Sequence, residues 1–190
     1  MDTTALQDAY RKLLDAAAAV AEVGDPAPVP PAGEWNADQI LAHVSLISAV
    51  TIAAVAAVES GANTTYDNRL ALDAWTLAHV TELAGGNAGL RDRIRHQADA
   101  LCTLVGPVLS EAELATPVPT RLLSHNAVLV DQPVPLRDLI NGLAEVEVPG
   151  HAKQLLALLP NGVEGEVEAD AEAEVEAEVE AEVEVELSVA

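Results

Sequence analysis

The stretch Pro135–Leu159, PLRDLINGLAEVEVPGHAKQLLALL, decides the fold that we predict for this chain. Its apolar residues recur mostly three and four positions apart, which is the spacing of a helix with one buried face. Glu147 and His151 lie four positions apart, so on a helix both side chains project from the same side. Such a pair can fill two coordination positions of one metal ion in a helix bundle. A third ligand must come from elsewhere, because this spacing also arises by chance in many helices.

The composition favours helices. Half of the 190 residues are hydrophobic, and most of these are Ala, Val or Leu, with no Phe, two Trp and two Tyr. Ala and Leu favour helices, whereas the aromatic residues that are typical of strands are nearly absent. We therefore predict an all-α fold for one domain over residues 1–162, which has room for a sizeable core.

Residues 163–190 form an acidic low-complexity segment in which Glu alternates with Val or Ala. Twelve of the 31 acidic residues lie between Glu164 and Glu186, which leaves 19 acidic against 9 basic residues in the rest of the chain. A helix would repeat like charges four positions apart, and a strand would place every carboxylate on one face, so we expect disorder and a solubilising role. The formal net charge of −22 excludes nucleic acid and anionic membranes as favourable partners.

The single cysteine, Cys102, excludes a disulfide within the chain, and we expect it to be a small buried apolar residue. The N-terminal residues show no basic segment followed by an apolar run. Both features indicate a cytoplasmic protein. The most apolar run, Leu46–Val58, is shorter than the ~20 residues that a membrane span requires, so we interpret it as part of a buried helix.

The rest of the chain contains further helical patterns and one segment with strand character. The residues Asp25–Gly33 contain four prolines and indicate an extended linker. The β-prone residues Thr120–Leu123 and Ala127–Val130 flank Ser124-His125-Asn126 and predict a short hairpin or an ordered loop before the last helix. The other predicted helices are Thr3–Val23, Asn36–Glu59, Arg69–Leu83 and Ala88–Leu109.

The third candidate ligand is His43, in the sequence Leu41-Ala42-His43 on a helix that begins near Asn36, just after Trp35. A Trp, a Leu-Ala-His helix and a late Glu-x-x-x-His motif occur here in an order that resembles the DinB-like four-helix bundles. Within them, the chain resembles the metal-binding N-terminal domain of mycothiol-dependent maleylpyruvate isomerase, because many other DinB-like proteins carry His-x-x-x-His at the second place. The resemblance covers residues from about 5 to 159.

This resemblance implies a divalent metal, most often zinc, on His43, Glu147 and His151. Three protein ligands leave one position open for water or a thiol, and a thiol bound to a cation loses its proton readily. The implied cofactor is mycothiol or another small thiol, and the implied partner is a small electrophilic substrate of an isomerase or S-transferase. In the isomerase a further C-terminal domain contributes to the active site, and here the acidic segment stands at that place. Neither the catalytic residues nor the oligomeric state follow from the sequence, and a homodimer stays open.

Interpretations without a metal stand beside this one. Pro149 falls between two of the candidate ligands and predicts a kink or a fresh helix start, because an interior proline costs ~3 kcal/mol or more. His43 alone fits a core histidine bonded to a carbonyl or hydroxyl group, His151 fits a position near a helix end, and Trp35 fits a packing anchor. The second hypothesis is therefore a non-catalytic helical-bundle protein for binding or assembly, without metal, that uses the acidic segment as an interaction arm.

Overall fold

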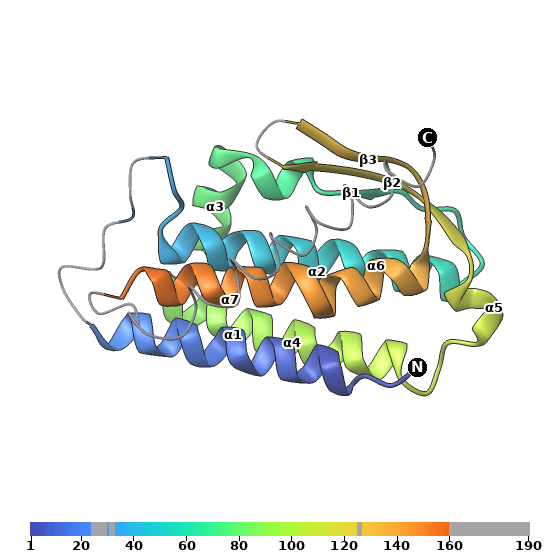
Figure 1. Cartoon of the computed structure of the whole chain (residues 1–190), viewed down its shortest axis with the longest axis horizontal. Helices are drawn as coiled ribbons and strands as arrows, with labels where there is room; N and C mark the ends of the chain where they lie inside the picture. Colours follow the sequence, from blue (N-terminus) through green and yellow to red (C-terminus); the bar gives the residue numbers. More distant parts are fainter. Residues whose placement is uncertain (24–29, 31–32, 125–126, 160–190) are drawn as a thin grey trace, which may run out of the picture. The chain divides into compact units, whose positions relative to one another are not determined.

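The computed structural model describes residues 1–23, 30, 33–124 and 127–159, which belong to one unit that ends at Leu159. Most of the predicted linker, two of the three hairpin-turn residues and the whole acidic segment lie outside the described residues. Figure 1 labels the α-helices and the strands. In chain order the elements are α1 (Thr4–Glu22), α2 (Ala37–Glu59), β1 (Tyr66–Asp67), the 3₁₀ turn η1 (Arg69–Leu72), α3 (Ala74–Ala84), α4 (Asn87–Val105), α5 (Glu111–Leu114), β2 (Pro117–Ser124), β3 (Ala127–Pro135), α6 (Leu136–Gly142), the π-helical turn η2 (Leu143–Glu147) and α7 (Val148–Ala157).

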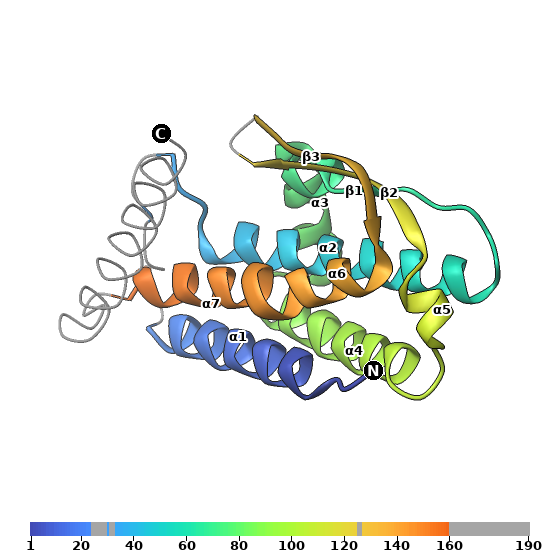
Figure 2. The same ribbon diagram turned by 45° about the vertical axis from the view of Figure 1, so that its right-hand side comes forward.

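The long helical segments α1, α2, α4 and α6–η2–α7 lie side by side in both views (Figure 1 and Figure 2). Helix α1 packs against α4 and α7, and α2 packs against the same two elements. By their colours in Figure 1, α1 and α6–α7 run in one direction, and α2 and α4 run in the other. The core between them is built mainly from Ala, Leu, Val and Ile side chains, as the composition predicts.

Helix α2 carries the first candidate ligand and is the most apolar element. Asn36 caps its start, because the Gln39 N–H donates to Asn36 Oδ1 at 2.9 Å and the Asn36 N–H donates to Gln39 Oε1 at 3.0 Å. Among the described residues it is the one helix long and apolar enough to cross a membrane, and 61% of its apolar window is buried inside the fold. The apolar helix is thus longer than the run Leu46–Val58 that stands out in the sequence.

The predicted helix Arg69–Leu83 is interrupted at Asp73, so that prediction was wrong in its continuity. Residues before Asp73 form η1, and Asp73 itself caps α3 by accepting the Thr76 N–H at 2.8 Å. Helix α3 ends at Gly85, whose φ of 81° is the left-handed conformation that favours glycine. The break places η1 against α2, where the backbone of η1 becomes available to the candidate site.

The predicted hairpin is present and longer than expected. Strands β2 and β3 pair antiparallel, and β1 adds to β2 in parallel, which was not predicted from the sequence. The buried Asn68 side chain fixes this sheet, because its Nδ2 donates to the Leu123 carbonyl and its Oδ1 accepts the Leu123 N–H, both at 2.9 Å. The fold is therefore mostly helical with a small three-stranded sheet, rather than wholly α-helical.

The last helical segment, α6–η2–α7, contains Pro149 and stays helical along its whole length. The turn η2 is π-helical, and the Val148 N–H bonds to the Leu143 carbonyl, five residues back. Pro149 is the second residue of α7 and follows this wide turn directly. The helix does not start afresh after Pro149; a wide π-helical turn precedes the proline instead.

Candidate metal centre

His43, Glu147 and His151 come together, and each offers one ligand atom within 4.8 Å of the others. His43 Nε2, from α2, lies 2.9 Å from Glu147 Oε1, at the end of η2. His151 Nε2, from α7, lies 3.3 Å from the same carboxylate oxygen. The Glu147–His151 spacing places these two on one side of the last helical segment despite Pro149. The structure thus brings together the three residues that were singled out in the sequence.

The spacing of these atoms fits a tetrahedral ion with little rearrangement. Two ligand atoms that each lie about 2.1 Å from such an ion are about 3.4 Å apart. The two distances to Glu147 Oε1, 2.9 and 3.3 Å, are close to that value. Since no pair exceeds 4.8 Å, no distance must shorten by more than about 1.4 Å to reach the same value. Small rotations of the side chains supply such a change.

The hydrogen bonds of the two imidazoles place the metal-binding nitrogen at the centre of the cluster. His43 Nδ1 lies 2.8 Å from the Ala71 carbonyl oxygen, which can only accept, so Nδ1 carries a proton. His151 Nδ1 lies 2.8 Å from Gln154 Oε1 and is likewise the donor. In a neutral imidazole with Nδ1 protonated, Nε2 has a free lone pair, and in both residues Nε2 faces Glu147. This is the arrangement that ligating histidines adopt around a cation.

The electrostatics of the cluster favour a charged carboxylate. When each Nε2 also carries a proton, the hydrogen bonds from His151 first and His43 second hold the pKa of the Glu147 carboxyl well below its usual range, although partial burial opposes this. The side chains of His43 and His151 are only 3% and 12% exposed, whereas that of Glu147 is 39% exposed. The cluster is therefore closed by the histidines on one side and reachable from solvent beside the carboxylate.

Trp35 forms an aromatic wall next to the cluster. Its ring centroid lies 4.9 Å from that of His43 and 6.3 Å from that of His151, and the second pair is stacked with 17° between planes. Trp35 was interpreted from the sequence as a packing anchor, and it packs on both imidazoles. It restricts the orientation of both rings and leaves their Nε2 atoms facing Glu147.

Two partners of the cluster were missed in the sequence. The Ala71 carbonyl that fixes His43 belongs to η1, and a backbone acceptor carries no signal in the sequence. Gln154 lies three residues after His151, a spacing that brings the two side chains together on a helix and could have been recognised.

The other chemistry-bearing residues of the described chain lie elsewhere. Cys102 on α4 is half-buried rather than fully buried, and burial, with a smaller contribution from Asp99, raises the pKa of its thiol. It is therefore a poor nucleophile. His79 and His96 are exposed, as expected, and His125 lies outside the described residues.

Comparison with known proteins gives no further assignment. No protein-family model matches the chain, and no curated protein or solved structure matches it either. The functional argument therefore depends on the chemistry of the His43–Glu147–His151 cluster.

Proposed function

We propose that this chain is a DinB-like four-helix bundle with up-down-down-up topology that binds one divalent metal ion, zinc, through His43, Glu147 and His151. In this proposal it is a cytoplasmic enzyme of the mycothiol-dependent maleylpyruvate isomerase type, or a related S-transferase, and it acts on a small electrophile with mycothiol or another small thiol. The convergence of three ligand atoms within 4.8 Å is the observation that carries the proposal.

The chemistry of the donor set supports a reactive rather than a structural site. Two imidazole nitrogens and one carboxylate oxygen are the ligands of many catalytic zinc sites, whereas structural sites hold four protein ligands. A bound divalent cation would supply charge that stabilises a thiolate, the nucleophilic form of a thiol. The chain itself orients the ligands: Ala71 and Gln154 hold the protons of His43 and His151 on Nδ1, and Trp35 fixes the ring planes. The exposed side of Glu147 leaves room for a small thiol to approach.

A second candidate, a non-catalytic bundle without metal, is favoured by one observation. Glu147 accepts a hydrogen bond from each histidine when both rings carry a proton on Nε2 in addition to the one on Nδ1. A polar cluster of this kind can fix the packing of α2 against α7 without an ion. The two candidates differ in whether a cation or protons hold the three side chains together.

Metal analysis of the purified protein separates the candidates. The chain is expressed with added zinc, purified without chelators and analysed for metals by mass spectrometry. We expect about one divalent ion per chain, because three ligands of this type bind zinc tightly. His43→Ala should lose the ion, and His96→Ala, which changes an exposed histidine on α4, should keep it. Stoichiometry near zero in the unaltered chain would refute the metal site.

The thiol chemistry has its own test. The metal-loaded chain is offered mycothiol, glutathione or cysteine together with small electrophiles such as cis-dienoic keto acids, and consumption of the electrophile is followed by absorbance. We expect turnover with at least one thiol that is lost in His43→Ala. A metal-loaded chain that consumes no electrophile with any thiol would retain the metal site and refute the enzyme assignment.

A further inference from the structure

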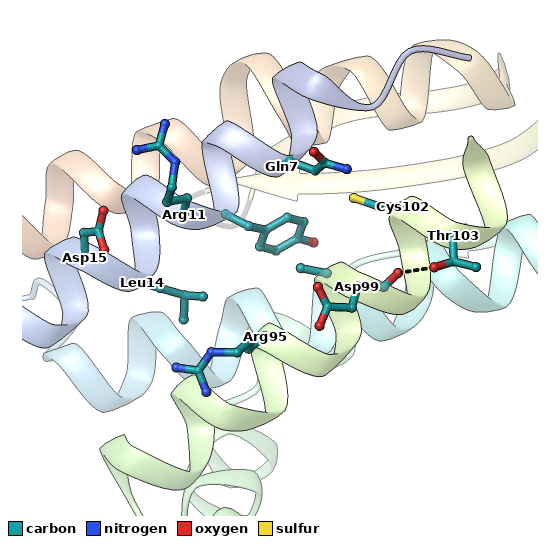
Figure 3. Close-up of a pocket in the computed structure, with 10 residues that line it drawn as sticks. Gln7, Arg11, Leu14, Asp15, Arg95, Asp99, Cys102 and Thr103 are labelled. Carbon is teal, nitrogen blue, oxygen red and sulfur yellow. Dashed lines mark hydrogen bonds between the residues drawn. The ribbon is translucent and has the colours of Figure 1, made fainter. Parts of the chain in front are cut away.

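A groove of about 670 Å³ runs between α1 and α4 (Figure 3). It contains none of the three candidate metal ligands, so it is separate from the site described above. Tyr10 and Leu14 of α1 and Ala98 and Cys102 of α4 contribute its floor. In Figure 3, charged side chains from both helices border it. The groove is thus a partly apolar depression with a charged rim.

The register of the two helices places opposite charges at the same level. The N-terminal ammonium group donates to the Gly106 carbonyl at 3.0 Å, so the start of α1 lies beside the end of α4 and the helices are antiparallel. Thr3 also packs against Gly106. Counting forward along α1 from Thr3 and back along α4 from Gly106 places Arg11 within one residue of the level of Asp99, and Asp15 within one residue of the level of Arg95. Figure 3, followed from left to right, shows Asp15 before Arg11 on α1 and Arg95 before Asp99 on α4. The rim therefore has positive and negative charges at alternate corners of a rectangle.

Such a rectangle is complementary to a copy of itself. A two-fold axis along the groove brings Arg11 of one copy over Asp99 of the other and Asp15 over Arg95. A two-fold axis across the groove brings Arg11 over Asp15 and Asp99 over Arg95. In either case every charge meets its opposite, as an interface between two identical surfaces requires.

We propose that the α1–α4 groove is the contact surface between two copies of this chain in a symmetric dimer. The four charges Arg11, Asp15, Arg95 and Asp99 set the alignment of the two copies, and the apolar floor lies in the centre of the contact.

The charge balance of the whole chain favours this face over others. Outside residues 163–190 the chain carries 19 acidic and 9 basic residues, so like charges predominate on this part of the chain and two copies repel each other. Helices α1 and α4 together carry five acidic and five basic residues and are neutral as a pair. This face therefore lacks the like-charge repulsion that opposes a contact elsewhere.

The rim charges are free to change partners on association. Arg11 pairs with Asp8, and Arg95 pairs with Asp92, each on its own helix, with side chains more than half exposed. Exposed pairs of this kind contribute little to stability. Exchange for partners on the second copy therefore costs little.

Two charge-reversed variants test the proposal. Asp15→Arg/Asp99→Arg gives an all-positive rim, and Arg11→Asp/Arg95→Asp gives an all-negative rim. All four side chains are exposed, so both variants should fold, which circular dichroism and thermal unfolding check. Sedimentation velocity over a range of concentrations then measures the mass of each variant alone and of their mixture.

We expect the unaltered chain to sediment as a dimer. Each variant alone should dimerise roughly tenfold to a hundredfold more weakly, and an equimolar mixture of the two should form a heterodimer. Arg93→Asp, which changes an exposed arginine of α4 that does not border the groove, should leave the dimer intact. One reversed variant has a more positive net charge than the unaltered chain, and the other has a more negative one. If both variants lose the dimer, the change in net charge cannot be the cause.

Three results would overturn the proposal. One is an unaltered chain that stays monomeric at every concentration. The second is a dimer that both variants retain, which would place the contact elsewhere. The third is a mixture that stays monomeric, which would mean that charge pairing across the groove does not set the alignment. If the groove instead binds a small molecule or an unrelated protein, the unaltered chain should stay monomeric, which is the first of these results.

Discussion

Replacement of Glu147 by Gln separates a metal site from a hydrogen-bonded polar cluster. The amide keeps the shape of the carboxylate but removes its charge, and with it one of the three ligands. Structural zinc sites with four protein ligands bind with about 10–16 kcal/mol, or about 3 kcal/mol per ligand, so the loss of Glu147 should weaken binding at least about a hundredfold.

This change in affinity converts to a thermal shift. Zinc at about a hundred times the Kd of the unaltered chain stabilises the fold by about 2.7 kcal/mol, which raises Tm by roughly 5–10 °C for a domain of this size. At the same zinc concentration the Glu147→Gln variant would be half-saturated, with a gain of about 0.4 kcal/mol or roughly 1–2 °C. Thermal unfolding followed by circular dichroism, with chelator and then with zinc, measures both values.

The matched control is Glu145→Gln, which makes the same charge change at an exposed residue two positions earlier. It should keep the full zinc-dependent rise. An equal rise in the Glu147→Gln variant and the unaltered chain would refute the role of Glu147 as a ligand. A loss of stability of about 1–2 kcal/mol that is the same with chelator and with zinc would instead identify a hydrogen-bonded cluster, after allowance for the partial exposure of Glu147.

Three further predictions concern the frame around the site. Asn68→Ala should destabilise the fold by about 2–4 kcal/mol, because it leaves the N–H and carbonyl groups of the half-buried Leu123 unpaired. Urea unfolding measures this loss, and Asn63→Ala, at an exposed asparagine, should change stability little. Asn36→Ala should cost about 1 kcal/mol through loss of the α2 cap, while Asn36→Asp, which can still accept the Gln39 N–H, should restore most of it in the same assay. Burial raises the pKa of Tyr66 from 10.0 to about 12, and the hydrogen bond between its hydroxyl group and that of Thr51 opposes this rise. Because the pKa of Tyr66 is higher in the folded than in the unfolded state, its contribution to the free energy of unfolding is complete below about pH 10 and is lost as the pH rises towards 12. Stability should therefore fall less steeply with pH in Tyr66→Phe than in the unaltered chain above pH 10. An equal slope in both chains would contradict this.

The helical part of the fold follows from the sequence because its signals are local. Apolar spacing and caps such as Asn36 predict where α1, α2 and α4 lie within a few residues. The parallel pairing of β1 with β2 was not predictable in this way, because a two-residue strand has no periodicity and its partner lies more than fifty residues later. The break at Asp73 was missed because the apolar spacing continues across it, although an Asp three residues before a Thr is a capping signal.

The candidate site, too, was predicted only in part from the sequence. His43, Glu147 and His151 were found from the order of motifs, since no spacing within the chain relates a residue on α2 to one a hundred positions later. The interactions that give the site its chemistry were not found in the sequence. The Ala71 carbonyl and the ring contacts of Trp35 depend on how η1 and the start of α2 pack around the cluster.

The π-helical turn at Leu143–Glu147 shifts the phase of the helix that follows it. Each residue of an α-helix advances by about 100°, so one residue accommodated in a wide turn rotates everything after it by that angle. Buried residues lie on both sides of the turn, among them Ile140, Ala144, Val148, Ala152 and Leu155. Deletion of a single residue from this turn would therefore rotate α7 by about 100° relative to α6 and take His151 away from Glu147 and His43.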